Sequence, residues 1–215
     1  ERQPAPWALA GIPADFNNRL LPDDWDRFAP LMEAAIRRVP AVEDADIVQL
    51  VNGPEGFTPD NEFVLGESEV AGLFVAAGFC AHGIAGAGGV GRVMAEWILD
   101  GESSFDTWKM DIRRFGPAYR SRDHALARTV EVYATYYDIH YPNEERHAGR
   151  PLRLTPAWPR LAVLEAEFGE KSGWERANWF APPGVEPKDD WSFRRTNYFP
   201  HVGNECRRIR SGVGV

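Results

Sequence analysis

Residues 52–97 read NGPEGFTPDNEFVLGESEVAGLFVAAGFCAHGIAGAGGVGRVMAEW, and this stretch decides the fold. Its pattern predicts a turn, a strand, a second turn, a second strand and then a glycine-rich loop that opens a helix near Gly89. Backbone without Cβ atoms can approach a ligand closely, and the first N–H groups of a helix have no partner within the helix. Such a loop suits an anion or an electron-rich ring edge. Its glycines are Gly83, Gly86, Gly88, Gly89 and Gly91.

The composition indicates a soluble globular protein of one or two domains, with 215 residues, 44% hydrophobic and 26% charged. A formal net charge of -8 argues against a nucleic-acid partner, because phosphate binding draws on clustered Lys and Arg. Cys80 and Cys206 form neither a disulfide framework nor a metal-binding spacing, so no metal site is predicted. No apolar run approaches the roughly 20 residues of a membrane span. We therefore expect no membrane association and a cytoplasmic location, or the mitochondrial matrix in a eukaryote.

Periodic patterns outside residues 52–97 predict a mixed α+β (α/β) chain. Apolar residues between Phe28 and Val39 recur at helical spacing, with Asp23 or Asp24 placed to cap the helix and Pro40 to end it. The run Leu73–Ala77 is apolar throughout, which is typical of a strand buried on both faces. The remaining predicted elements are strands at 46–50 and 62–65 and helices at 89–99, 123–137 and 202–210, the first of these three helices ending at Asp100 and Gly101.

The segment Gly86–Gly91 formally matches the pattern G-x-G-x-x-G of dinucleotide-binding folds. That fingerprint belongs to a βαβ unit with an acidic residue about 20 positions on, at the end of the next strand. Here the predicted helix leads into Asp100-Gly101-Glu102 and a second helical piece instead. We therefore reject a dinucleotide fold for this segment.

Several motifs, in order, cover nearly the whole chain and resemble one family. They are Asn52-Gly53-Pro54, Thr58-Pro59-Asp60, Gly78-Phe79, Gly88-Gly89-Val90-Gly91, Tyr141-Pro142-Asn143-Glu144-Glu145-Arg146, Gly149-Arg150-Pro151, Gly173-Trp174-Glu175, Asn178-Trp179-Phe180 and Ser192-Phe193-Arg194-Arg195-Thr196-Asn197. With these motifs the chain resembles the FAD-dependent dimethylglycine and sarcosine dehydrogenases, from the C-terminal part of their flavin domain onward.

The resemblance implies a partial FAD-oxidoreductase fold followed by a helical and irregular connector. Residues 1–116 would be the C-terminal portion of the flavin domain, residues 117–172 the central connector, and residues 173–215 the start of a folate-binding, aminomethyltransferase-like domain. The family's N-terminal FAD-binding half and most of its C-terminal folate domain have no counterpart in the chain. We therefore expect an internal piece of a longer enzyme, with a natural short protein as the alternative.

The resemblance also places the bend before the predicted helix along the flavin ring. His82 would hydrogen-bond the cofactor, line the substrate pocket or act in catalysis, although a lone histidine is often structural. Glu55 would contact a cationic amine, and no residue is assigned to a metal. The implied cofactor-binding residues are Phe79, Cys80, Ala81, His82, Gly83, Ile84, Ala85, Gly86, Gly88 and Gly89.

The implied function is that of a flavoprotein oxidoreductase of one-carbon metabolism. An N-methyl amine such as dimethylglycine or sarcosine would pass a hydride to FAD, and its methylene would go to tetrahydrofolate or leave as formaldehyde. The chain alone would bind FAD poorly and be inactive. Two other classes stay open: a non-catalytic binding or interaction module, and a folate-dependent aminomethyltransferase without a flavin site.

Overall fold

The computed structural model describes residues 10–212 and divides the chain into two compact units. One unit is Ala5–Gly56, and the other runs from Phe57 to the C-terminus. Helices are mixed with two separate antiparallel sheets of two strands each, in agreement with the predicted α+β class. None of the described helices is both long enough and apolar enough to cross a membrane.

In the unit Ala5–Gly56, the main element is helix α2, Trp25–Arg38. The Asp24 carboxylate accepts a hydrogen bond from the backbone N–H of Arg27 at 3.0 Å, which confirms the predicted cap. A 3₁₀ turn, Pro40–Val42, ends the helix, as the proline predicts. Residues 10–56 contain no fully buried side chain, and Phe28, Met32 and Ile36 on the apolar face of α2 are half-buried.

The strand predicted at residues 46–50 is wrong. These residues belong to no strand in the structure, although they lack helical structure as well. The extended backbone of this unit is hydrogen-bonded at another place. There the N–H of Leu21 donates to the Asn52 carbonyl at 2.8 Å. Strand propensity alone is insufficient, because a strand also needs a neighbouring backbone that completes its hydrogen bonds.

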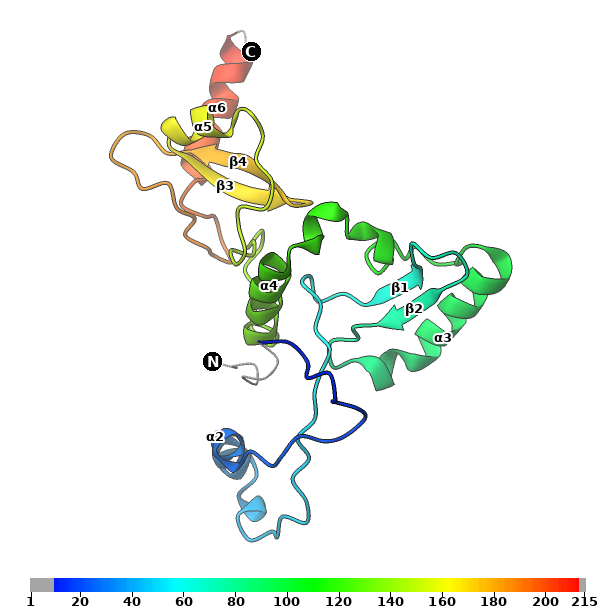
Figure 1. The fold of residues 1–215 in the computed structure, drawn as a ribbon. Helices are drawn as coiled ribbons and strands as arrows, with labels where there is room; N and C mark the ends of the chain where they lie inside the picture. Colours follow the sequence, from blue (N-terminus) through cyan, green and yellow to red (C-terminus); the bar gives the residue numbers. More distant parts are fainter. Residues whose placement is uncertain (1–9, 213–215) are drawn as a thin grey trace. The chain divides into compact units, whose positions relative to one another are not determined.

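The second unit begins with strands β1, Val64–Glu67, and β2, Phe74–Ala77, paired antiparallel, and helix α3, Gly83–Asp100, lies beside this hairpin (Figure 1). Both strands agree with the predicted ones to within two residues. The expectation that residues 73–77 are buried on both faces is wrong, since they are half-buried or exposed. A hairpin of only two strands with one helix against it leaves part of its surface uncovered.

Helix α3 begins six residues earlier than predicted. The loop containing Gly83, Gly86, Gly88 and Gly89 is helical, and the N–H of Gly86 already donates to the His82 carbonyl at 2.8 Å. Glycine disfavours a helix by about 1 kcal/mol, a cost that packing against the hairpin can offset. The predicted end is confirmed, because Gly101 adopts the left-handed conformation with φ of 85°.

Short 3₁₀ turns at Ile112–Arg114 and Pro117–Arg120 lead into helix α4, Arg122–Ala134. After α4 come the short helix α5, Trp158–Val163, strands β3, Ala166–Lys171, and β4, Trp174–Phe180, and helix α6, Phe199–Ser211. The helices predicted at 123–137 and 202–210 are thus confirmed, with shifted ends. The domain boundary predicted between residues 172 and 173 falls in the turn of the β3–β4 hairpin.

Ion pairs connect the β3–β4 hairpin to α4 and to the segment that follows α4. Glu170 of β3 pairs with Arg128 of α4 at 2.5 Å, and Glu175 of β4 pairs with Arg150 at 2.6 Å. Because the side chains of Arg150 and Glu175 are only 12% and 5% exposed, loss of either would leave a buried charge without its partner. The sequence motif around Gly149-Arg150-Pro151 therefore has a structural role.

Glu167, on the same strand as Glu170, has a shifted pKa. Burial raises the pKa of its carboxyl to about 7, and the nearby negative charge of Asp189 raises it further. Burial likewise raises the pKa of Asp189, although that carboxylate accepts a hydrogen bond from the Trp179 indole N–H at 2.7 Å. The hairpin thus contains a carboxyl group that folding favours in its protonated form.

A glycine-to-alanine substitution at Gly66 should destabilise the first hairpin. Gly66 has φ of 110°, and a Cβ there would lie 2.8 Å from the Trp97 ring. We expect Gly66→Ala to lower the free energy of unfolding by about 1–3 kcal/mol through overpacking and backbone strain. Gly72 is the control, because it also has positive φ, 78°, but nothing within 4 Å of a Cβ. Equal losses of thermal stability in Gly66→Ala and Gly72→Ala would show that contact with Trp97 is unimportant.

Stability should fall as pH rises through the range in which Glu167 titrates. Its pKa is about 7 in the folded chain and 4.5 in an unfolded one, so its contribution is fully present below pH 4.5 and lost by about pH 7. Glu167→Gln should therefore raise the melting temperature at pH 8 and leave it nearly unchanged at pH 4.5. Glu205→Gln on the exposed surface of α6 serves as the control and should show no such difference. A Glu167→Gln effect that is independent of pH would contradict this assignment.

Candidate functional site

The candidate site is the bend of residues 78–82, which joins β2 to α3. Three of its residues have left-handed backbone: Gly78 with φ of 62°, Cys80 with 47° and Ala81 with 65°. Only glycine adopts this region readily, so Cys80 and Ala81 add strain of about 1–2 kcal/mol each. Their surroundings must therefore hold the bend in place.

Thr58 supports the buried side of the bend. Its hydroxyl donates to the Glu62 carbonyl at 2.9 Å and lies 3.6 Å from the Cys80 sulfur, while its methyl group packs where a Cβ of Gly78 would be, 2.6 Å away. Thr58 is 5% exposed and Cys80 1% exposed. The motif Thr58-Pro59-Asp60 therefore supports the bend directly.

Tyr136, just beyond the end of α4, contacts the bend from the other side. Its hydroxyl lies 3.0 Å from the Cys80 carbonyl, 2.7 Å from His82 Nδ1 and 2.9 Å from His82 Nε2. His82 Nδ1 is also 2.9 Å from the Cys80 carbonyl. Phe57 packs edge-on against Tyr136, with ring centroids 5.4 Å apart. Thr58 and Tyr136 thus contact the bend on two sides. The exposed side of the bend is called its outer surface below.

The predicted cofactor-binding residues divide between an inner and an outer surface. Gly83 faces Phe79, and Gly86 faces Phe63, where a Cβ would approach the ring to 3.0 Å. The side chain of Cys80 is buried, so only its backbone can meet a ligand. The outer residues are all exposed; they are Ala81, His82, Ile84, Ala85, Gly88 and Gly89.

The outer surface contains exposed apolar side chains next to backbone that no side chain covers. Ile84 is 97% exposed, and a Cβ added at Gly88 or Gly89 would meet nothing within 4 Å. His82 begins α3 without a side-chain hydrogen bond to cap it. The N–H groups of the first turn, at residues 83–85, therefore lack partners within the helix and can bind an electron-rich edge. A flat ring with a polar edge fits both features.

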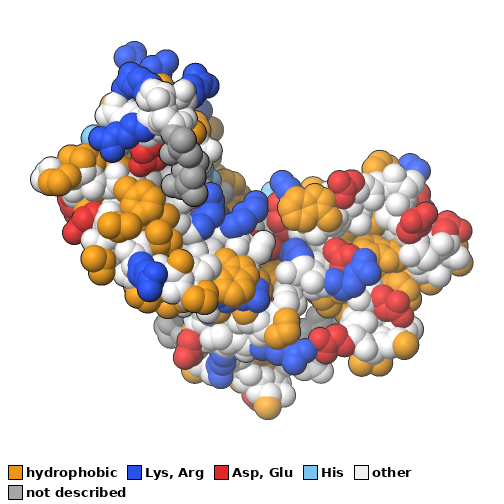
Figure 2. Space-filling model, turned by 90° about the horizontal axis from the view of Figure 1, so that it is seen from above, with side chains coloured by type: hydrophobic (Ala, Val, Ile, Leu, Met, Phe, Trp, Pro, Cys, Tyr) orange, Lys and Arg blue, Asp and Glu red, His pale blue; other side chains and the backbone are white. Residues whose placement is uncertain are grey.

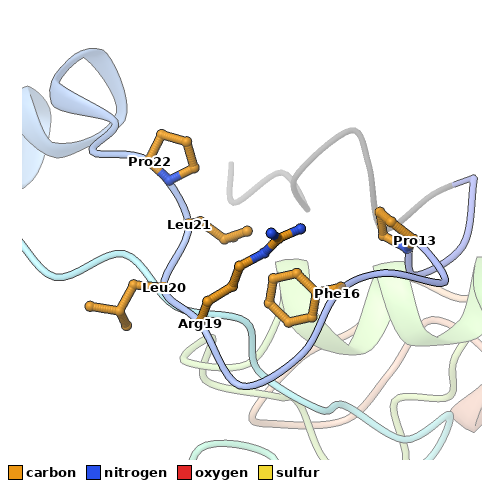
Figure 3. Close-up of a pocket in the computed structure, with 6 residues that line it drawn as sticks. All are labelled: Pro13, Phe16, Arg19, Leu20, Leu21 and Pro22. Carbon is orange, nitrogen blue, oxygen red and sulfur yellow. The ribbon is translucent and has the colours of Figure 1, made fainter.

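Glu55 and an apolar depression belong to the other unit of the chain. Glu55 is exposed and belongs to the unit Ala5–Gly56. That unit also contains an apolar depression, drawn in Figure 3, which none of the predicted site residues lines; Pro13, Phe16, Arg19, Leu20, Leu21 and Pro22 line it. Within residues 10–212 no group of three or more His, Cys, Asp or Glu side chains is arranged to hold a metal ion.

Exposed hydrophobic side chains are common beyond the bend. Figure 2 shows them among charged side chains over the face that it draws. In α3 alone, Ile98 and Leu99 are 54% and 81% exposed. Large exposed apolar areas usually mark contacts with other protein segments or ligands.

The sequence did not single out Tyr136. Its neighbours Tyr133 and Tyr137 fit the helical stripe of the predicted helix 123–137, whereas Tyr136 lies two residues past the end of the observed helix and bonds to a bend 54 residues earlier. The only available signal was the density of tyrosines between residues 133 and 137. Thr58 was recognised as part of a rigid turn, but its contact with Cys80 was not foreseen.

Two family descriptions match parts of the chain. Residues 8–97 match the family described as FAD dependent oxidoreductase, and residues 100–155 match the FAD dependent oxidoreductase central domain. The chain belongs to the FAD-dependent oxidoreductase family. The bend and α3 as far as Trp97 fall in the match over residues 8–97, and Tyr136 falls in the match over residues 100–155.

Three relatives show which members of the family are similar. The chain is 44% identical over 191 residues to a 4-methylaminobutanoate oxidase (formaldehyde-forming) of Paenarthrobacter nicotinovorans, covering 88% of the chain and 23% of that protein. It is 37% identical over 212 residues to the mitochondrial dimethylglycine dehydrogenase of Rattus norvegicus, covering 98% and 24%. It is also 38% identical over 199 residues to the mitochondrial pyruvate dehydrogenase phosphatase regulatory subunit of Mus musculus, covering 91% and 23%. The chain spans about a quarter of the length of these relatives.

Replacing Thr58 with valine should loosen the bend. Thr58→Val keeps the shape but removes the hydroxyl and its hydrogen bond to the Glu62 carbonyl beside the Cys80 sulfur, at a cost of about 0.5–1.5 kcal/mol. We expect a lower melting temperature and faster alkylation of Cys80. The exposed Cys206 provides an internal reference, since its alkylation rate should not change. Unchanged Cys80 reactivity would show that the hydroxyl does not hold the bend.

Proposed function

We propose that this chain forms part of the flavin site of an FAD-dependent enzyme that demethylates an N-methyl amine, with dimethylglycine and sarcosine as the candidate substrates. The observation that carries the proposal is the uncapped first turn of α3, placed behind a strained bend whose outer surface is open. Two relatives support the substrate class, because their names specify a methylaminobutanoate and dimethylglycine.

Bound FAD would supply the oxidising power by accepting a hydride from the N-methyl carbon. The chain's own groups would bind and orient it. The amides of residues 83–85 would donate to the electron-rich edge of the ring, and the partial positive charge at the start of α3 would favour negative charge there. Ile84 and Ala85 would cover the ring and exclude water. His82 would contact the cofactor or line the substrate pocket, and Glu55 would bind the cationic amine.

The remaining parts of the proposal concern the product and the domains. The released methylene would pass to tetrahydrofolate or leave as formaldehyde, as the name of one relative specifies for that protein. Residues 1–116 would belong to the flavin domain, residues 117–172 to the connector and residues 173–215 to the start of a folate-binding domain. The protein would act in the cytoplasm, or in the mitochondrial matrix of a eukaryote.

A second candidate is a non-catalytic regulatory role. It is favoured by the similarity to a pyruvate dehydrogenase phosphatase regulatory subunit, whose name describes regulation of another enzyme. The same fold would then provide an interaction surface, for which its many exposed hydrophobic side chains are suited. The two candidates differ in one measurable property, the reduction of bound flavin by an amine.

The direct test is to purify the complete gene product and add dimethylglycine or sarcosine without oxygen. An enzyme should purify yellow, and its absorbance near the flavin maximum should fall on addition of the amine. A folded protein that stays colourless with added FAD would contradict the flavin site. A yellow protein that no N-methyl amine bleaches would favour the regulatory role.

Gly88→Ala separates the flavin site from simple helix stability. Alanine should stabilise α3 by about 1 kcal/mol, since Gly88 lies in open helix surface, yet its methyl group should weaken FAD binding where the ring approaches. Gly203→Ala in α6 is the matched control, because it too lies in a helix with nothing within 4 Å. Both variants of the complete gene product should melt at a higher temperature than the wild type. Only Gly88→Ala should bind FAD more weakly in a fluorescence titration. Equal FAD affinity in both would exclude Gly88 from the site.

A further inference from the structure

The Tyr136 hydroxyl forms hydrogen bonds with the bend of residues 78–82, more than 50 positions earlier in the chain. It lies in the segment matched by the central domain, whereas the bend lies in the segment matched by the FAD dependent oxidoreductase family. Its contacts therefore connect two segments of the chain at the candidate flavin site.

The Tyr136 hydroxyl meets a backbone carbonyl and an imidazole together. A carbonyl can only accept, so the Cys80 carbonyl accepts a hydrogen bond from the Tyr136 hydroxyl or from His82 Nδ1, which lie 3.0 Å and 2.9 Å away. Both imidazole nitrogens lie within 2.9 Å of the hydroxyl. Either tautomer of His82 can thus bond to Tyr136, so the contact fixes the position of the ring without selecting its protonated nitrogen.

Holding His82 also holds the start of α3. His82 is the cap residue of this helix, and its carbonyl accepts the hydrogen bond from Gly86 that closes the first turn. Cys80, whose carbonyl Tyr136 also bonds, has one of the two strained non-glycine left-handed conformations within the bend. A hydroxyl that bonds to both residues therefore opposes relaxation of the bend and rotation of the first turn.

The position of Tyr136 is itself restricted. Phe57 packs edge-on against it with an interplanar angle of 90°, and Tyr137 also packs edge-on, with an interplanar angle of 66° and ring centroids 4.6 Å apart. Phe57 also packs edge-on against Tyr133, at 5.0 Å. This aromatic cluster of Phe57, Tyr133, Tyr136 and Tyr137 limits the directions in which the Tyr136 hydroxyl can point.

We propose that Tyr136 is a positioning residue of the flavin site. Its hydroxyl holds the Cys80 carbonyl and the His82 ring so that the amides of residues 83–85 face the electron-rich edge of the flavin. This role rests on the proposed flavin site and adds to it a residue outside the glycine-rich segment. It makes the central domain segment a determinant of the electrostatic environment of the flavin.

The test compares wild-type protein with Tyr136→Phe, which keeps the ring and removes the hydroxyl. In the flavin-loaded gene product we expect roughly tenfold weaker FAD binding and a flavin midpoint potential shifted to more negative values, because misaligned amides stabilise reduced flavin less well. A purely structural role would lower thermal stability without shifting the potential. Tyr141→Phe is the matched control, since its ring packs against Phe193 instead, and its potential should not change.

A second measurement does not involve the cofactor. In the 215-residue chain, Tyr136→Phe should change the NMR signals of the His82 ring nitrogens and speed amide hydrogen exchange at residues 83–85. If Tyr136→Phe folds poorly, Phe57→Leu should give a smaller potential shift in the same direction, because it loosens Tyr136 and keeps the hydroxyl.

The outcomes separate this role from the flavin site itself. Wild-type protein that binds no FAD would overturn both. Wild-type protein that binds FAD, together with an unshifted potential in Tyr136→Phe, would overturn the positioning role alone. Unchanged exchange at residues 83–85 in Tyr136→Phe would also overturn it, because the hydroxyl would then not hold the first turn.

Discussion

The strained bend of residues 78–82 is the constraint on which the candidate site depends. Cys80 and Ala81 both adopt left-handed backbone, which side-chain-bearing residues avoid, so the bend persists only because its neighbours hold it. Thr58 does so from the buried side and Tyr136 from the other. In return, the chain turns sharply from β2 into α3, and the first amides of the helix have no side-chain cap. A relaxed bend would rotate those amides and remove the polar edge of the site.

Glycines in α3 serve two purposes that the sequence does not distinguish. Gly83 and Gly86 face Phe79 and Phe63, so their missing side chains permit close packing inside the unit. Gly88 and Gly89 face open space, so their missing side chains permit close approach from outside. The first pair stabilises the helix against its neighbours, and the second pair weakens it. A helix that keeps destabilising glycines on its open surface is typical of a surface that another group must approach.

The second half of the chain depends on electrostatics more than on an apolar core. Arg128, Arg150 and Arg176 each pair with a glutamate of the β3–β4 hairpin or of the connection before it. Burying such pairs contributes little net stability, but breaking one is costly, so they define which surfaces meet. The motif Glu144-Glu145-Arg146, prominent in the sequence, belongs to this set: Glu145 accepts from the Glu170 amide and from Arg176. Its role in the structure is to attach the hairpin to the segment that follows α4.

The sequence by itself determined the family, the α+β class, the capped helix α2, the hairpin before α3 and the glycine that ends α3. These features depend on residues close together in the chain, where hydrophobic spacing, caps and turn residues act locally. Only the tertiary structure decided that the glycine-rich segment is helical from Gly83, that Cys80 is buried and that Tyr136 reaches His82. The reason is physical: a hydrogen bond between residues 54 positions apart, and a helix of glycines that is stable only when packed, depend on neighbours that no local pattern specifies.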